Sequence, residues 1–196
     1  MAATGFAGVY VDANAIAPVT ARTIGARFER FVDGAIIGPP VHEAGSTRLY
    51  LSGDDTDAIV DLWRRSPLEV RVIGGGAGAA SALKMCFAGW TKGSAALLLA
   101  MRALAHAEDV EDALLAEWAT SMPELAVQSE RAAAKNSPKA WRFAGELREI
   151  ASASAEHGLP EGFGRAAAEV YDALASLRDT SDVTIAAVLE ALLAPE

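Results

Sequence analysis

One lysine stands inside an otherwise apolar helical pattern, and its residue type and setting suit it to proton transfer. Lys84 lies in GGGAGAASALKMCFAGWTKG, residues 74–93, where its immediate neighbours on both sides are apolar. Ser81, Ala88 and Lys92 lie three residues before it, four after it and eight after it, so they share one helical face with it. An ammonium held against apolar walls gives up its proton more readily than one in water. Lys84 is therefore a candidate acid or base, and a solvated surface lysine is the alternative.

The chain that positions this lysine changes character near Gly74. Before it, patterns typical of strands alternate with patterns typical of helices, which predicts βαβ units and a largely parallel sheet. The predicted strands are 7–12, 31–37, 47–52 and 69–73, and the predicted helices are 18–27 and 54–65. The sequence thus predicts an α/β part over residues 1–76 that ends in the glycine-rich run.

Everything after Gly78 has the periodicity of helices. The predicted helices are 79–106, 110–120, 123–134, 138–157, 161–177 and 183–193. Many of their residues are alanines, whose small side chains let helices approach closely, and long apolar helices of this kind often pack against a second subunit. We therefore expect an all-helical domain over residues 77–196 that forms a homodimer.

The composition narrows the choice of partner and compartment. The 196 residues are 52% hydrophobic and carry a net charge of −9, which allows a sizeable core and argues against nucleic acid or an anionic membrane as the partner. One cysteine and three histidines predict neither an intramolecular disulfide nor a zinc site. We expect no signal peptide, no transmembrane segment and no bound metal. The expected protein is cytoplasmic and acts on a small molecule.

Three short motifs precede the helical half in a characteristic order. They are VYVDANAIAP at 9–18, VDGAIIGPP at 32–40 and GAASALKMCFA at 78–88. In this order and setting they resemble the β-hydroxyacid dehydrogenase and 6-phosphogluconate dehydrogenase superfamily, over nearly the whole chain. The run SALKMCFAGWTKG is similar to the signature of its phosphogluconate-dehydrogenase-like branch, whose C-terminal domain has no assigned role. The resemblance implies an α/β plus all-α fold, in which a truncated Rossmann-like parallel sheet precedes a helical 6-phosphogluconate-dehydrogenase-like domain.

The resemblance also implies roles for the first two motifs. In the family, a loop of the form Asp-x-Ser/Asn-x-x-x-Pro passes beside the nicotinamide, and Asp12, Asn14 and Pro18 match it. The second motif stands where the family has its substrate loop, Asp-Ala-Pro-Val-Ser-Gly-Gly. There Asp33 and Gly38 match, whereas isoleucine and proline replace the serine and the last glycine, so we expect altered substrate contacts.

The third motif carries the resemblance to the catalytic residue. Lys84 lies six residues after Gly78, as the family's catalytic lysine lies after its glycine, but Ala88 stands where the family has asparagine. The resemblance implies oxidation of an alcohol with NAD or NADP, or the reverse reduction, with Lys84 as the acid or base. Gly78 and Ser81 would lie at the substrate, and the backbone amides of Gly38 and of the turn 76–78 could hold a carboxylate or phosphate.

The phosphate-binding fingerprint of such enzymes, G-x-G-x-x-G between the first strand and its helix, does not occur in that setting. We expect that the coding start lies upstream and that the missing residues contain the fingerprint. The alternative is a natural short form that has lost dinucleotide binding and serves as a non-catalytic, dimeric helical binding module.

Two further charges lie in the helical half, within WRFAGELREI at 141–150. Arg142 and Glu146 are four residues apart, so they could pair with each other on the surface of a helix. A similar pattern in the resembling branch supports the alternative, in which both side chains contact the substrate.

Overall fold

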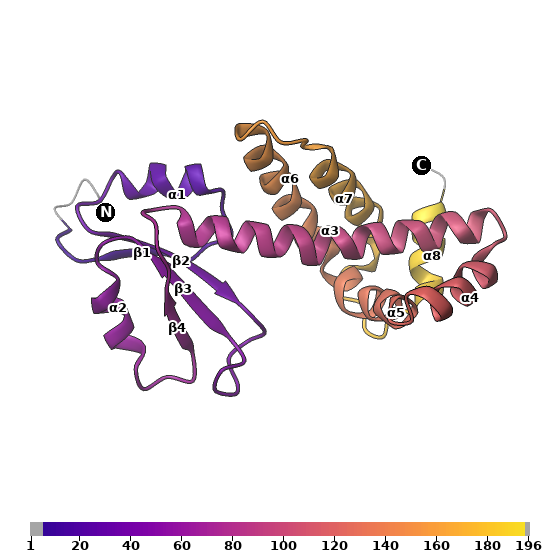
Figure 1. The fold of residues 1–196 in the computed structure, drawn as a ribbon, viewed down its shortest axis with the longest axis horizontal. Coiled ribbons are helices and arrows are strands. Elements are labelled where there is room, and N and C mark those ends of the chain that lie inside the picture. Colours follow the sequence, from indigo (N-terminus) through magenta and orange to yellow (C-terminus); the bar gives the residue numbers. More distant parts are fainter. Residues whose placement is uncertain (1–5, 195–196) are drawn as a thin grey trace. The chain divides into compact units, whose positions relative to one another are not determined.

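The computed structural model describes residues 6–194, shown in Figure 1. The chain forms two compact units, Met1–Phe87 and Ala88–Glu196. In the described part, no helix is long and apolar enough to cross a membrane. The domain boundary near residue 76 stays a prediction.

The first unit is built on a four-stranded sheet in the order β1-β2-β3-β4. Its strands are β1 (Tyr10–Asp12), β2 (Phe31–Ile37), β3 (Arg48–Ser52) and β4 (Glu69–Val72), and its shorter helices are α1 (Pro18–Gly25) and α2 (Thr56–Trp63). The predicted α/β fold is confirmed. β1 pairs with β2, and β3 with β4, in parallel, but β2 and β3 are antiparallel. Residues 38–47 between β2 and β3 contain no helix, and a parallel pairing needs a longer crossover.

The core of this unit is small and lies on the two central strands. Val32, Leu49, Leu51 and Ile59 are its buried members. β2 and β3 supply Val32, Leu49 and Leu51, and α2 supplies Ile59. Because Val32 and Asp33 are consecutive in β2, this core lies on the opposite face of the sheet from the polar residues described below.

The second unit is helical, as predicted. It begins within α3 (Ala79–Ala107) and continues through the helices α4 (Glu111–Ser121), α5 (Leu125–Asn136), α6 (Ala140–Glu156), α7 (Gly162–Ala173) and α8 (Ile185–Leu193). Short 3-10 helices, η2 (Ser137–Lys139) and η3 (Ala175–Leu177), join some of them. Gly164 lies where α6 and α7 cross, and a Cβ there would come within 2.9 Å of the Leu147 carbonyl oxygen. Small residues therefore set the helix spacing, as the alanine content suggested.

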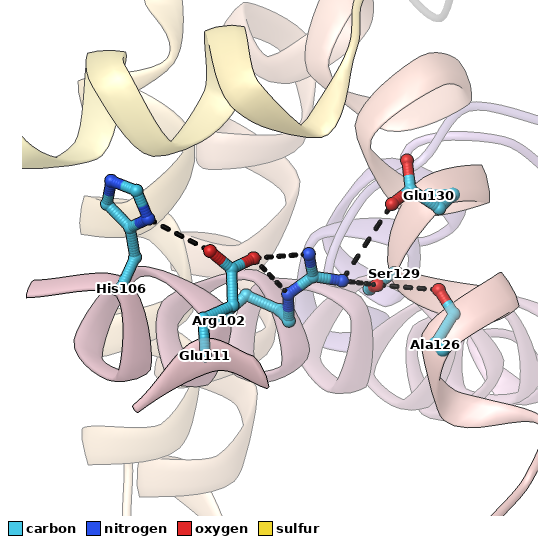
Figure 2. Close-up of polar contacts among 6 residues, drawn as sticks. All are labelled: Arg102, His106, Glu111, Ala126, Ser129 and Glu130. Carbon is cyan, nitrogen blue, oxygen red and sulfur yellow. Dashed lines mark hydrogen bonds and ion pairs between the residues drawn. The ribbon is translucent and has the colours of Figure 1, made fainter. Parts of the chain in front are cut away.

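A buried arginine network holds three of these helices together (Figure 2). Arg102 of α3 is only 3% exposed. Its Nη1 donates to Ser129 Oγ on α5 at 2.7 Å, and its Nε donates to Glu111 Oε1 on α4 at 3.0 Å. Glu111 Oε2 also lies 2.9 Å from His106 Nδ1. Hydrogen bonds from Arg102 first, and then from His106, lower the pKa of the Glu111 carboxyl from its usual value.

Candidate functional site

The first turn of α3 is attached to the sheet by polar side chains. Ser52 Oγ, at the end of β3, accepts a hydrogen bond from Ala80 N at 3.0 Å. Asp33 Oδ2, on β2, accepts one from Ser81 N at 2.9 Å, and Asp33 Oδ1 accepts one from Ser81 Oγ at 2.6 Å. Asp33 and Ser52 are fully buried. Two residues predicted to contact substrate, Asp33 and Ser81, are thus brought together as a hydrogen-bonded pair.

A row of polar residues crosses three strands at this place. Asp12 is paired in register with Asp33, and Asp33 is paired in register with Ser52. In-register neighbours on adjacent strands point to the same face of a sheet. Asp12 is 4% exposed, and its Oδ1 accepts hydrogen bonds from the backbone N and the Nδ2 of Asn14, both at 2.9 Å. The predicted cofactor loop therefore starts with a buried carboxylate that fixes the exposed Asn14 beside it.

The start of α3 also approaches the start of α1. Gly78 has a φ of +95°, and a Cβ there would lie 2.9 Å from the Pro18 carbonyl oxygen and 2.9 Å from Arg22 Nη1. Pro18 is buried and occupies the first turn of α1. The residues predicted for the cofactor loop and for the substrate turn, Pro18 and Gly78, are therefore neighbours.

Gly38 lies away from this cluster. It follows the end of β2, five residues after Asp33, which is about 16 Å along an extended strand. Its φ is +132°, and a Cβ there would come within 2.6 Å of the Ser46 carbonyl oxygen. This glycine allows the loop 38–47 to fold closely onto β3.

Lys84 is half-buried on α3, one turn beyond Ser81. Since residues three apart share a helical face, Lys84 follows the side chain that contacts Asp33. Met85 and Ala88 beside it are buried. The arrangement is suited to proton transfer, because an amine beside apolar neighbours sits next to a rigidly anchored helix start.

The predicted residues of α6 lie in the second unit and do not pair with each other. Glu146 forms an ion pair with Lys92 of α3, and these two side chains are 20% and 17% exposed. Lys92 Nζ also lies 4.3 Å from the centre of the Phe143 ring. Arg142 is exposed. The expected surface pair of Arg142 with Glu146 is therefore wrong, since the acid is bound to a lysine distant in sequence.

A dinucleotide needs free amides for its pyrophosphate, and the described residues do not offer them at α3. The glycine run does stand between a strand, β4, and a helix. However, the Ala80 and Ser81 amides already donate to Ser52 and Asp33, and the Asp33 carboxylate would repel a second anion there. The described residues could contribute at most the loop at Asp12 and Asn14 beside a nicotinamide. Among them, no group of three or more metal-ligating side chains is gathered.

Comparison with known proteins gives the same reading of the fold. Residues 105–174 match the family described as "Domain of unknown function (DUF1932)". A conserved protein of unknown function, MTH1747, whose structure is described as similar to 3-hydroxyacid dehydrogenases, is 28% identical with a TM-score of 0.71. The alignment covers 87% of this chain and 66% of that one. The fold of the chain is therefore similar to that of 3-hydroxyacid dehydrogenases.

Other relatives agree on the fold of this dehydrogenase-like chain. A conserved hypothetical protein from Sinorhizobium meliloti 1021 is 22% identical with a TM-score of 0.73, over 94% of this chain and 65% of its own. The 3-hydroxyisobutyrate dehydrogenase of Mycobacterium tuberculosis, with L-serine, is 18% identical with a TM-score of 0.61, over 95% of this chain and 70% of its own. An uncharacterised 28.5 kDa protein of Methanothermus fervidus is 34% identical over 110 residues, which are 55% of this chain and 42% of that protein. The chain thus spans less than half of this last protein and about two thirds of the structural relatives.

Sequence reasoning missed Ser52 and the partners of Arg102. A serine at a strand end has the signature of an ordinary turn residue, and only the sheet register places it beside Asp33. Arg102 did carry a signal, because it is a charge inside an apolar helical run like that around Lys84.

Proposed function

We propose that this chain provides the proton-transfer residue and the helical domain of a nicotinamide-dependent oxidoreductase of the β-hydroxyacid dehydrogenase type. The substrate is a small hydroxy acid or a related alcohol. One observation carries the proposal: Lys84 lies one turn beyond a helix start that the sheet holds through Asp33 and Ser52. The likeness to MTH1747 supports it. We propose a reducing cytoplasm as the compartment, which the single cysteine fits.

In this reaction Lys84 accepts the proton of the substrate hydroxyl at Nζ, or returns it in the reverse direction. NAD or NADP, when bound, supplies the hydride acceptor or donor. The loop at Asp12, Asn14 and Pro18 would line the nicotinamide, and Asp12 holds Asn14 through two hydrogen bonds.

Each unit, taken by itself, carries candidates for recognition of the substrate. Backbone amides at the turn 76–78 are candidates for contacts with a substrate carboxylate or phosphate, and Gly38, which lies away from this turn, would serve only a separate contact. Arg142 is the second candidate, since its guanidinium is exposed and suits bidentate binding of an acid. Glu146 would act together with Lys92, which it already pairs with.

The test compares two lysine variants. Lys84→Met removes the amine and keeps the length of the side chain, and Lys135→Met makes the same change at an exposed site on α5. We measure turnover of small hydroxy acids with NAD and with NADP, together with thermal unfolding. Loss of turnover in Lys84→Met alone, at unchanged melting temperature, is expected. Turnover retained in Lys84→Met would refute the assignment.

A second candidate function is a dimeric helical binding module without catalysis. The specific observation is an apolar stripe on α3, formed by Trp90, Leu97, Met101 and Leu104, which are 75%, 62%, 40% and 54% exposed. Their spacings of seven, four and three residues match the seam of a paired helix. A groove of about 570 Å³ runs beside Trp90, Leu97 and Met101 toward the buried Trp118. We propose that a second copy of the chain covers this stripe.

Sedimentation distinguishes the two candidates. Leu97→Glu should convert a dimer to a monomer, whereas Leu159→Glu, at a residue 61% exposed outside the stripe, should not. A dimer that shows no change of NADH or NADPH fluorescence on titration, and no turnover, supports the module. Cofactor binding and turnover support the oxidoreductase.

A further inference from the structure

We infer that Asp33 and Ser52 are positioning residues for Lys84. They fix the first turn of α3 to the sheet and thereby determine where the Lys84 side chain stands. The inference rests on the proposed catalytic role of Lys84 and assigns Asp33 a task other than contact with the substrate.

No side chain just before α3 can accept hydrogen bonds from the first amides of the helix. The first amides of a helix have no partner within the helix, and they are usually satisfied by a serine, threonine, aspartate or asparagine just before it. Here the preceding residues, 74–78, are glycine and alanine, which have no side-chain oxygen. Ser52 and Asp33 supply the missing acceptors from the sheet, at 3.0 Å for Ala80 N and 2.9 Å for Ser81 N.

The side chains complete a closed set of hydrogen bonds. Ser81 Oγ donates to Asp33 Oδ1 at 2.6 Å, and Ser52 Oγ donates to Asp33 Oδ2 at 3.3 Å. Asp33 and Ser52 are 0% exposed and Ser81 is 1% exposed, so water does not replace a lost partner, and an unsatisfied group here is costly. The negative charge of Asp33 also complements the positive end of the helix dipole. The first turn of α3 therefore has one strongly preferred place on the sheet.

The position of the first turn also determines the position of Lys84, because both belong to α3. Lys84 lies three residues beyond Ser81, about 4.5 Å along the axis and on the same face. Proton transfer tolerates misplacement of the reacting groups of only about 1 Å before the rate falls. Fraying or tilting of the first turn would move Lys84 by at least this amount. Asp33 and Ser52 thus act on the reaction through Lys84 without touching the substrate.

The experiment observes Lys84 directly in the whole chain. The lysines of the sequence are Lys84, Lys92, Lys135 and Lys139, so reductive methylation with ¹³C-formaldehyde gives a small set of dimethylamine NMR signals. The Lys84 signal is identified by its loss in Lys84→Arg. Spectra are recorded for Ser81→Ala, Ser52→Ala and Asp33→Asn, together with hydrogen exchange of the first turn of α3.

The matched control is Thr47→Val. Thr47 is 1% exposed, directly precedes β3 and donates to the Pro39 carbonyl oxygen, so the change removes a buried hydrogen bond without touching α3. It should lower the stability of the unit as a serine variant does, yet leave the Lys84 signal in place. A role confined to stability would move the signal equally in both.

The expected result is that the Lys84 signal shifts toward those of Lys135 and Lys139 in the Ser81, Ser52 and Asp33 variants. The amides of Ala80 and Ser81 should exchange about tenfold faster. A Lys84 signal that stays in place in folded Ser81→Ala and Ser52→Ala, or that moves equally in Thr47→Val, overturns the inference. If Asp33→Asn does not fold, Ser81→Ala and Ser52→Ala alone test the inference.

Failure of the proposed function would look different. None of these readouts needs a cofactor or a substrate, so turnover that is retained in Lys84→Met would refute the catalytic role and leave the anchoring of Lys84 measurable. Conversely, turnover that depends on Lys84 alongside an unmoved signal would refute only the positioning role.

Discussion

Gly78→Ala tests whether the start of α3 depends on a close backbone approach. Gly78 has a φ of +95°, a region that costs a residue with a Cβ about 1–3 kcal/mol. The added Cβ would also lie 2.9 Å from the Pro18 carbonyl oxygen, so the backbone must shift, which we take as about 1 kcal/mol more. The lower entropy of the unfolded alanine chain returns about 0.4–1 kcal/mol. The net expected loss of stability is about 2 kcal/mol.

Gly74→Ala is the matched control within the same glycine run. A Cβ at Gly74 would meet nothing within 4 Å, and its φ is not positive. The same chemical change should therefore stabilise the unit slightly, by about 0.5 kcal/mol, through the unfolded state alone. The two variants should differ in sign, and by about 2.5 kcal/mol in size.

The assay must report on the first unit by itself. Hydrogen exchange of β2 and β3 in urea gives the free energy of opening of their sheet, because these amides exchange only when the sheet opens. The unfolding midpoint of these strands should fall in Gly78→Ala and stay or rise in Gly74→Ala. Equal midpoints in the two variants would refute the reasoning, since they would show that the run is a flexible connection without a required conformation.

Three further predictions concern the second unit. Hydrogen bonds from Arg102 and His106 lower the pKa of Glu111 in the folded chain. Its contribution to stability is therefore present above its unfolded pKa and is lost as pH falls through the folded value. In Glu111→Gln, the urea midpoint should depend less on pH between about pH 6 and pH 3. Burial raises the pKa of Tyr171 to about 12 from 10.0, which predicts that about 3 kcal/mol of stability is lost as pH rises from about 10 to 12. The parent should lose this stability and Tyr171→Phe should not. A double-mutant cycle of Lys92→Met and Glu146→Gln, followed by urea unfolding, should give a coupling of about 1 kcal/mol, and additivity would mean that the ion pair contributes nothing.

The sequence predicts which segments are strands and helices, but not the direction of every strand. Alternating residues mark β2 and β3 equally well in either direction, since the pattern of a strand reads the same both ways. What decides the antiparallel pairing is the connection of residues 38–47, which turns back without a crossover helix. The prediction of a largely parallel sheet therefore holds for two of the three pairings.

In the candidate site, too, the local sequence predicts which residues stand out but not which residues they contact. Lys84, Arg102 and Lys92 each stand out as charges in the apolar pattern of one helix. The sequence does not distinguish them, because their partners come from elsewhere in the chain: Glu111 and Ser129 for Arg102, and Glu146 for Lys92. The guanidinium of Arg102 donates its hydrogen bonds to Glu111 and Ser129, so this residue supports the fold. The pairing of Arg102 and of Lys92 thus depends on the fold and not on the local pattern of the helix.

The start of α3 explains why the glycine run and the sheet residues belong together. A local capping residue would let the helix begin wherever its own sequence dictates, independent of the sheet. Without one, the helix is complete only when Asp33 and Ser52 reach its first amides, and this requires the close approach at Pro18 that Gly78 permits. The start of α3, and with it the position of Lys84, is therefore set by the strands that carry Asp33 and Ser52 and not by a local cap.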